Sequence, residues 1–216
     1  MTDTAPEPLA ARNPLPSELD SKLVEQLGFI IEVDKLKTIL RQSPLAAAAR
    51  RENDAEHSWH LALMVIVLGA HADEPIDVGH TIKLVVVHDL VEIYAGDTPL
   101  HHPSASVGQL ERERAAAEKL FGLLPEQGSY LRELWDEFEG RATPEARFAK
   151  AMDRLQPILL NWMAKGGTWD APGVTAADVR TRTCGIGDAS AALWDAAQHL
   201  IGASEHRGWL RTSTDG

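Results

Sequence analysis

Four residues whose side chains can bind metal ions lie in segments that have the pattern of buried helices. They are His57, His88, Asp89 and Asp153. His88 and Asp89 are neighbours behind the apolar run Leu84–Val87, where an unpaired charge would be costly to bury. Successive residues of a helix point about 100° apart, so the pair could not hydrogen-bond to each other on one face. Both could instead reach one metal ion that lies between their two directions.

Two imidazole nitrogens and two carboxylate oxygens form a ligand set of intermediate hardness. Such a set suits Mn, Fe, Co, Zn or Mg better than it suits a thiolate-bound structural zinc. In a catalytic site, water or substrate fills the remaining positions. The sequence therefore predicts one divalent metal ion that takes part in chemistry.

Helices are expected to position these residues, because apolar residues recur at helical spacing along most of the chain. Helices are predicted from an N-cap at Ser17 through Leu27, from Val33 to Arg41, from Asn53 or Asp54 to Ala72, from Asp77 to Tyr94, and over 107–124, 129–139, 144–165, 175–182 and 189–202. The helix after Asn53 should be buried nearly all round. The run Ile82–Val87 could also be a strand, but no second strand candidate exists to pair with it. Residues 45–51 fit either a short helix or an ordered loop.

The predicted architecture is all-α with one domain. Residues 1–16 are dotted with proline and are expected to be a disordered lead-in, 17–205 a helical bundle, and 206–216 a polar tail. The start of the chain lacks the pattern of a signal peptide, and the longest apolar stretch is too short to cross a bilayer. The single cysteine, Cys184, favours a reducing compartment. These features predict a cytoplasmic protein with no membrane partner.

The net charge of −11 opposes binding to a nucleic-acid polymer, because no cationic surplus is available to replace its counterions. A small anionic substrate remains possible where a metal ion or a few arginines screen the local field. Arg50 and Arg51 precede the helix that carries His57, whose N-terminus favours anions. They are therefore candidate phosphate ligands.

Three strings around the four candidate ligands resemble the HD-domain metal-dependent phosphohydrolases, and in particular their 5′-deoxynucleotidase group. The strings are 52–58 (ENDAEHS), 88–97 (HDLVEIYAGD) and 150–153 (KAMD), and the similarity spans about 24–165. The resemblance implies an HD-domain helical bundle whose metal ligands are the two histidines and two aspartates. It also implies that Glu92 positions or deprotonates a water molecule, with Asp97 beside it, and that Lys150 contacts substrate.

Glu92 follows Asp89 by three residues and His88 by four, which places all three on the same side of one helix. The bacterial deoxynucleotidases of the group carry an Arg-Trp pair before the first metal histidine. Here Arg41-Gln42 is the nearest equivalent, so Arg41 is a further candidate for substrate binding. The aromatic residue that follows the arginine in that group is absent.

The expected function is release of phosphate from a nucleoside or deoxynucleoside 5′-monophosphate by metal-activated water. One alternative is a non-catalytic nucleotide-binding or regulatory module. Another is a hydrolase of the same type that acts on a different phosphate ester, including a two-metal enzyme for which His60 and His101 are available but not at convincing positions. A homodimer is also expected, because the helices carry more apolar surface than a small bundle needs.

Overall fold

The computed structural model describes residues 7–12, 14–47, 49–96 and 108–212. Its helices are α1 Leu9–Arg12, α2 Ser21–Val33, α3 Asp54–Leu68, α4 Val78–Val87, α5 Glu92–Ala95, α6 Gln109–Phe121, α7 Gly128–Gly140, α8 Pro144–Met163, α9 Ala176–Thr183 and α10 Ala191–His206. Four 3₁₀ helices (η1 Asp34–Thr38, η2 Gly69–His71, η3 Gly167–Asp170, η4 Cys184–Asp188) and two strands (β1 Leu40–Pro44, β2 Arg51–Asn53) complete the described part. The all-α prediction is confirmed.

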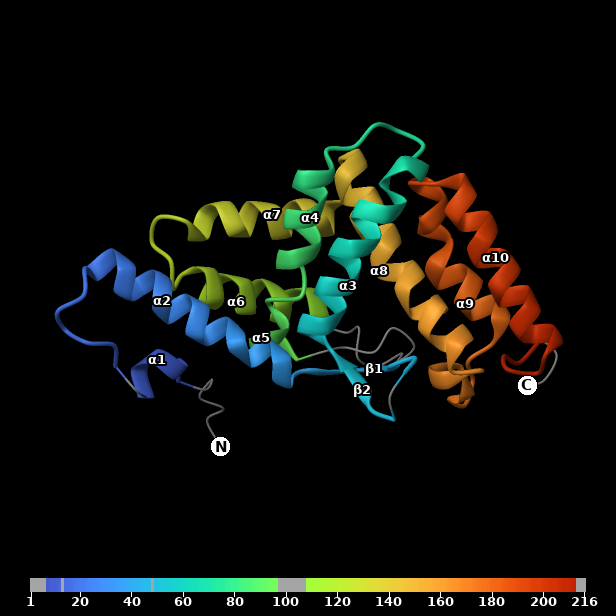
Figure 1. Ribbon diagram of the computed structural model, residues 1–216, viewed down its shortest axis with the longest axis horizontal. Helices are drawn as coiled ribbons and strands as arrows, with labels where there is room; N and C mark the ends of the chain where they lie inside the picture. Colours follow the sequence, from blue (N-terminus) through green and yellow to red (C-terminus); the bar gives the residue numbers. More distant parts are fainter. Residues whose placement is uncertain (1–6, 13, 48, 97–107, 213–216) are drawn as a thin grey trace.

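Helix α8 runs through the middle of the molecule, with α3 and α4 packed against it (Figure 1). Helices α2, α6 and α7 lie toward one end, and α9 and α10 toward the other. In the described residues, no helix is both long enough and apolar enough to cross a bilayer. The three central helices are therefore the frame on which any site near His57, His88 and Asp153 is built.

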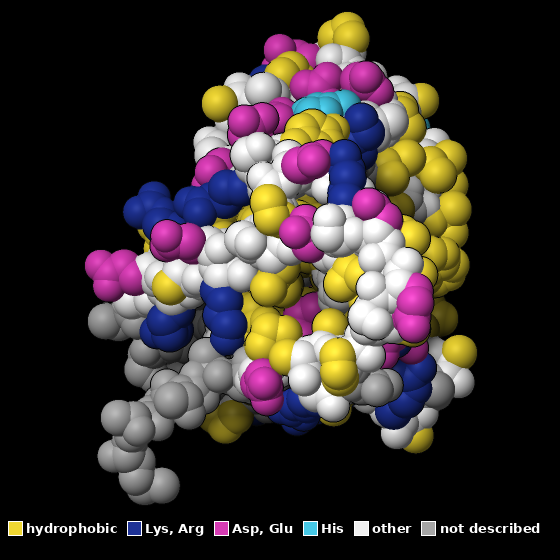
Figure 2. Space-filling model, turned by 90° about the vertical axis from the view of Figure 1, so that its left-hand side faces the viewer, with side chains coloured by type: hydrophobic (Ala, Val, Ile, Leu, Met, Phe, Trp, Pro, Cys, Tyr) yellow, Lys and Arg dark blue, Asp and Glu magenta, His cyan; other side chains and the backbone are white. Residues whose placement is uncertain are grey.

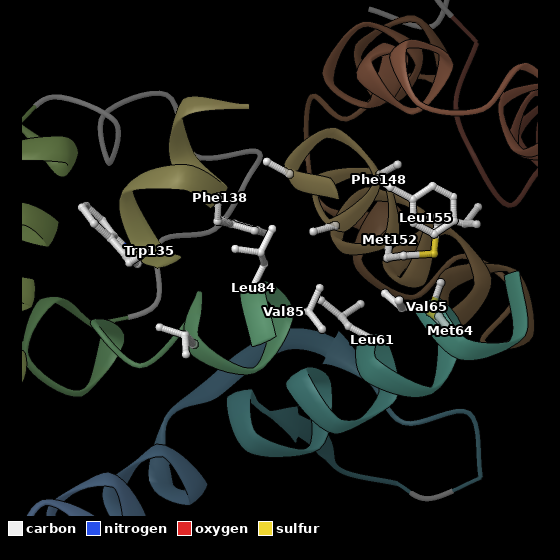
Figure 3. Close-up of a cluster of buried hydrophobic side chains, with 14 of the residues drawn as sticks. Leu61, Met64, Val65, Leu84, Val85, Trp135, Phe138, Phe148, Met152 and Leu155 are labelled. Carbon is white, nitrogen blue, oxygen red and sulfur yellow. The ribbon is translucent and has the colours of Figure 1, made fainter. Parts of the chain in front are cut away.

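The centre of the core lies where α3, α4 and α8 meet, with α7 closing one side (Figure 3). The side chains labelled there are Leu61, Met64, Val65, Leu84, Val85, Trp135, Phe138, Phe148, Met152 and Leu155, and all of them are buried. The prediction that α3 is buried nearly all round is wrong. Ile66 and Val67 are 60% and 64% exposed, because α4 and α8 cover only the opposite face of the helix.

Side-chain caps fix the starts of the two helices that lead into the candidate ligands. Asn53 accepts a hydrogen bond from the N–H of Glu56 at 2.9 Å, and the Glu56 carboxylate accepts one from the N–H of Asn53. Asp77 caps α4 in the same way, through the N–H of His80 at 3.0 Å. The predicted starts of these helices are confirmed. The first helix of the bundle begins later than predicted, at Ser21, with Asp20 rather than Ser17 as its cap.

The predicted helix over 33–41 is wrong. The chain forms η1 and then becomes extended at Ile39, and β1 pairs antiparallel with β2 so that Leu40 faces Asn53 and Pro44 faces Arg51. Leu40 is consequently 52% exposed, whereas Leu36 is buried as expected. Residues 45–51 were predicted to form either a short helix or an ordered loop. Those of them that the structure describes form the hairpin turn and the start of β2.

The predicted continuous helix from Asp77 to Tyr94 is interrupted. Helix α4 ends at Val87, and residues 88–91 form a turn before α5 begins at Glu92. The strand alternative for Ile82–Val87 is excluded, because this run is helical. Gly96 ends α5 with a positive φ of 78°, a conformation that glycine adopts without a steric penalty.

Part of the expected disordered lead-in is ordered, because residues 9–12 form α1 against α2. The backbone N–H of Leu9 donates to Glu32 at 2.6 Å, and the Tyr94 hydroxyl donates to the same carboxylate at 2.6 Å. Lys35 also pairs with Glu32, which is fully buried. Residues 1–6 and 13 lie outside the described part. Glu32 therefore joins the first helices to the segment that carries Glu92.

Replacing Glu32 with glutamine is expected to lower the free energy of unfolding by about 2 kcal/mol at neutral pH, because a buried charged acceptor with three donors is lost. Burial raises the pKa of Glu32, but its bonds to Lys35, Tyr94 and Leu9 outweigh burial and hold the pKa below the ordinary 4.5. The carboxylate thus stabilises the fold fully above pH 4.5, and that contribution fades as the pH falls through the lowered pKa. Urea unfolding of both proteins at pH 7 and pH 3 tests this. A difference that does not shrink at acidic pH would contradict it.

Candidate metal centre

His57, His88 and Asp153 lie together in the buried centre of the molecule. One ligand atom from each lies within 4.8 Å of the others. Nε2 of His57 is 3.1 Å from Oδ1 of Asp153, and Nε2 of His88 is 3.9 Å from the same oxygen. The three residues come from α3, from the end of α4 and from α8, so the packing of these helices creates the cluster.

Asp89 also belongs to this cluster. Its Oδ1 lies 3.0 Å from Nε2 of His88, and its Oδ2 lies 3.9 Å from Nε2 of His57. The sequence argument expected the side chains of 88 and 89 to diverge, as they do along a regular helix. The backbone of His88 is still helical, with φ −56° and ψ −43°, yet the polar atoms of the two side chains meet.

Both histidines present Nε2 to the cluster and turn their other ring nitrogen toward an oxygen atom outside it. Nδ1 of His88 is 2.8 Å from the carbonyl oxygen of Val85, one turn earlier in α4. Nδ1 of His57 is 3.6 Å from Oε2 of Glu52. Among the described residues, Nε2 of His88 is buried yet makes no hydrogen bond, although an oxygen of Asp89 lies nearby. A buried nitrogen of this kind is expected where a further ligand belongs.

The two aspartates are held in the ionised form that binds metals. Burial raises the pKa of Asp89, but the neighbouring His88 and Arg41 outweigh burial and place the pKa well below its usual range. Burial acts in the same direction on Asp153, and its hydrogen bond with His57 together with nearby cations reverses the effect. Two anionic oxygens therefore face two imidazole nitrogens.

This arrangement fits a divalent metal ion. The donor set has two nitrogens and two oxygens, Nδ1 of His88 is bonded to a backbone carbonyl, Nδ1 of His57 faces a carboxylate oxygen at 3.6 Å, and Nε2 of His88 has no hydrogen-bond partner among the described residues. His57, His88, Asp89 and Asp153 would hold the ion. The role that the sequence predicted for these four residues is thus compatible with their positions, and the identity of the metal stays open.

Arg41 lies directly beside the cluster, on strand β1. Its Nη1 is 2.8 Å from Oδ2 of Asp89 and 3.3 Å from Oδ1 of Asp54, and its Nη2 is 3.8 Å from Oδ1 of Asp153. The hairpin, rather than the predicted helix, places the guanidinium at this point. A planar group with several donors next to a metal centre is suited to hold phosphate oxygens.

A cavity of about 1490 Å³ opens from the cluster. Its wall includes four groups of described residues, from the end of α4 and start of α5 (His88, Asp89, Glu92), α6 and α7 (Gln109, Glu113, Trp135, Glu139, Arg141), α8 (Lys150, Asp153, Arg154, Pro157, Ile158, Asn161) and the segments around η3 and α9 (Trp169, Val174, Val179, Arg182, Thr183). Arg41 and the adjacent residues of β1 line it as well. Candidate metal ligands, other acidic residues and basic residues therefore line the same cavity.

Glu92 and Lys150 are both brought to this cavity. Glu92 is 9% exposed and begins α5, with its N–H donating to the carbonyl of Asp89 at 3.0 Å. Lys150 is one turn before Asp153 on α8, and its Nζ is 3.1 Å from Oε1 of Glu139 and 3.8 Å from Oδ2 of Asp153. Both positions are compatible with the roles that the sequence predicted.

Arg50 and Arg51 are not brought to the cavity. Arg50 pairs with Glu56 on the surface, with Nη1 at 2.8 Å from Oε2, and Arg51 is exposed at the start of β2. The helix N-terminus that they precede is capped by the Asn53 side chain. Asp97 lies outside the described residues, as does His101, so the structure does not place them.

Three buried polar residues at the centre were not assigned a role from the sequence. Glu52, Asp54 and Gln156 are between 0% and 2% exposed. Glu52 and Asp54 stand in the string around His57, and Gln156 follows Asp153 by three residues on α8. The sequence pointed to them only through their residue types at those positions. No spacing rule relates a residue on a short strand to a residue on a helix that packs beside it.

Comparisons with known proteins identify the family of the chain. A model of the HD domain matches residues 33–194, which include all four candidate ligands. The 5′-deoxynucleotidase HDDC2 of Bos taurus is 32% identical over 138 residues, and that of Homo sapiens is 30% identical over 138 residues. Each alignment covers 62% of this chain and, respectively, 64% and 65% of the relative, so the chain spans slightly less than two thirds of their length.

A solved structure extends the comparison over most of the chain. The crystal structure described as a predicted metal-dependent phosphohydrolase from Magnetospirillum magnetotacticum MS-1 is 48% identical, with a TM-score of 0.83. The match covers 88% of this chain and 96% of that one. The helical fold, the clustered histidines and aspartates and the extent of these matches lead to one conclusion: this chain belongs to the HD-domain family.

Proposed function

We propose that the protein is a divalent-metal-dependent phosphohydrolase that releases phosphate from nucleoside or deoxynucleoside 5′-monophosphates. The observation that carries this proposal is the buried two-histidine, two-aspartate cluster that opens into a cavity beside Arg41, Glu92 and Lys150. The names of the HDDC2 relatives and of the Magnetospirillum protein support the reaction class and, for HDDC2, the substrate class.

His57, His88, Asp89 and Asp153 would hold a divalent ion, which would polarise the phosphate and lower the pKa of water. Arg41 and Lys150 bind phosphate oxygens, and their charges offset the negative charge that develops in the reaction. Glu92 accepts a proton from the water whose oxygen attacks phosphorus. As the new P–O bond forms, the bond from phosphorus to the 5′ oxygen breaks, and the proton passes to that oxygen as the nucleoside leaves. His57, His88 and the two aspartates hold their positions through the packing of α3, α4 and α8.

The nucleoside part of the substrate is proposed to lie along α8. Lys150, Arg154, Pro157 and Asn161 recur every three or four residues, so one face of the helix lines the cavity over a length of roughly 16 Å. The cavity wall also includes apolar side chains beyond Asp153, which are Pro157 and the buried Val174 and Val179 from the segment around α9. A phosphate at the Asp153 end would leave the sugar and base against this wall.

The sugar preference is tested by the same experiment as the reaction. The protein is stripped of metal, Mn, Co, Zn or Mg is added back, and phosphate release is measured with matched ribo- and deoxynucleoside monophosphates. Metal-dependent turnover of monophosphates supports the proposal. If no monophosphate is hydrolysed although metal is bound, the non-catalytic nucleotide-binding module is favoured. If only a different phosphate ester is hydrolysed, a hydrolase of the same type with another substrate is favoured.

Replacing Arg41 with glutamine is expected to lower kcat/KM by about 10- to 100-fold, because a charge-assisted contact to phosphate contributes about 1.5–3 kcal/mol. The metal content should stay near that of the wild type, since Arg41 holds no ligand position. Arg50→Gln is the matched control, because its guanidinium pairs with Glu56 outside the cavity. Equal kcat/KM for both variants would remove Arg41 from the proposed phosphate site.

A homodimer is also part of the proposal. Hydrophobic side chains gather along the right-hand edge of the surface in Figure 2. On α3 and α4, five large apolar side chains are between 43% and 67% exposed: Trp59, Leu63, Ile66, Val67 and Val86. Isolated exposed apolar residues are common, whereas several on adjacent helices favour an interface. The cytoplasmic location stays a prediction from the sequence.

The face shown in Figure 2 carries acidic and basic side chains side by side, with no continuous basic stripe. This mixture and the net charge of −11 agree with a small phosphate ester, rather than a nucleic-acid polymer, as the proposed partner.

A further inference from the structure

Glu52 is a buried acid whose carboxylate faces Nδ1 of His57, the ring nitrogen that points away from the cluster. It lies on β2 and is 2% exposed, and its Oε2 is 3.6 Å from Nδ1 of His57. The other ring nitrogen of His57 points the opposite way, to Asp153 at 3.1 Å. The imidazole therefore stands between the carboxylate of Glu52 and the cluster.

Gln156 holds Glu52 in this position from α8. Its Nε2 donates to Oε1 of Glu52 at 2.6 Å and lies 3.3 Å from Nδ1 of His60. Gln156 is fully buried, and neither Glu52 nor Gln156 is among the described residues that line the cavity. The pair therefore reaches the cavity only through neighbouring side chains, which are His57 and Arg41, whose Nε is 3.9 Å from Oε2 of Glu52.

Burying a carboxylate and an amide costs free energy unless each is matched by polar partners. Glu52 and Gln156 are partners of each other, and Glu52 also lies near His57 and Arg41, while Gln156 lies near His60. The second histidine of the cluster is oriented differently, by the carbonyl of Val85 in its own helix. A carboxylate or a backbone carbonyl behind the ring is the usual way in which a metal-binding histidine is fixed in one tautomer.

We infer that Glu52, held by Gln156, is a positioning residue that keeps His57 protonated on Nδ1 and turns Nε2 toward the metal. This inference rests on the metal centre of the proposed function, but it does not depend on which phosphate ester is hydrolysed. Glu52 acts on the affinity for the metal and touches neither substrate nor the reacting atoms.

The test is the affinity of the metal-stripped Glu52→Gln variant for Mn²⁺ and Zn²⁺, measured by calorimetry or by competition with a chelator. The replacement keeps the size of the side chain and leaves an acceptor for Gln156. A loss of 10- to 100-fold in affinity is expected, as is typical for removal of such a carboxylate. Glu56→Gln is the matched control, since it removes the same charge one residue from His57 at a side chain that pairs with Arg50. An affinity within twofold of the wild type would overturn the inference.

A second measurement does not require a folded variant. Nitrogen-15 histidine spectra of the zinc-loaded wild type should show His57 protonated on Nδ1, with its proton shifted downfield by the carboxylate. Metal bound through Nδ1 would overturn the inference. A wild type that binds zinc with this signature, yet hydrolyses no phosphate ester, would refute the proposed function and leave the role of Glu52 intact.

Discussion

Replacing Asp89 with alanine is expected to abolish phosphate release and to lower the bound metal at the same time. One oxygen of Asp89 lies 3.0 Å from Nε2 of His88, and the other lies 3.9 Å from Nε2 of His57. The carboxylate is therefore close to both histidine nitrogens of the cluster. It also binds Arg41 at 2.8 Å. Its loss removes a metal ligand and the anchor of the proposed phosphate-binding cation in one change. No other residue of the cluster is bonded to Arg41 at so short a distance.

The two effects are measured on the same samples. Metal content is determined after dialysis against dilute metal, and phosphate release is followed with the best substrate of the panel. A decrease of at least about 10³-fold in kcat/KM is expected, which corresponds to roughly 4 kcal/mol of transition-state stabilisation. Asp136→Ala is the control, because that exposed aspartate pairs only with Arg132 on the surface of α7 among the contacts described. An Asp89→Ala variant that keeps both metal and turnover would refute the assignment of the centre.

The sequence predicted the parts of the fold that depend on neighbouring residues. The cap at Asn53, the start of a helix near Asp77 and the helical run on α8 follow from side chains within a few positions of one another. The three elements that carry His57, His88 and Asp153 could therefore be placed before the structure was known. That these elements meet at one point came from the resemblance and not from any spacing.

The errors fall where contacts between distant residues decide the backbone. Pairing of β1 with β2 extends the chain at Ile39 to Pro44, although the local apolar pattern favoured a helix. This hairpin is what carries Arg41 to Asp89 and Glu52 to Nδ1 of His57, with Arg41 Nε and Glu52 Oε2 3.9 Å apart. A pattern read along one segment cannot reveal a side chain that acts across two elements, so Glu52 and Gln156 were missed.

The break after Val87 is a second example with a direct effect on the site. The sequence pattern predicted one helix from Asp77 to Tyr94, whereas the chain turns over residues 88–91 and starts a new helix at Glu92. Glu92 therefore reaches the cavity as the first residue of α5, and not as part of the helix that carries His88.

Replacing Glu92 with glutamine is expected to lower kcat by about 10²- to 10⁴-fold while the metal stays bound. A positioned carboxylate that accepts a proton from water contributes a factor of this size, and an amide of the same shape cannot take the proton. Glu92 lines the cavity beside Asp89 and is 9% exposed, yet it is not one of the four residues proposed to hold the metal. The change should therefore separate catalysis from metal affinity, which Asp89→Ala cannot do.

The measurement compares kcat, KM and metal affinity of Glu92→Gln with those of Glu118→Gln, which removes the same charge from an exposed position on α6. If Glu92 served only to brace α5, the variant would lose thermal stability and its remaining folded molecules would turn over at the normal rate. If it were a metal ligand, affinity for Mn²⁺ would fall with kcat. A fall in kcat at unchanged metal affinity and unchanged melting temperature is the one pattern that a proton acceptor predicts. The three readouts together thus distinguish the chemical role of Glu92 from both structural ones.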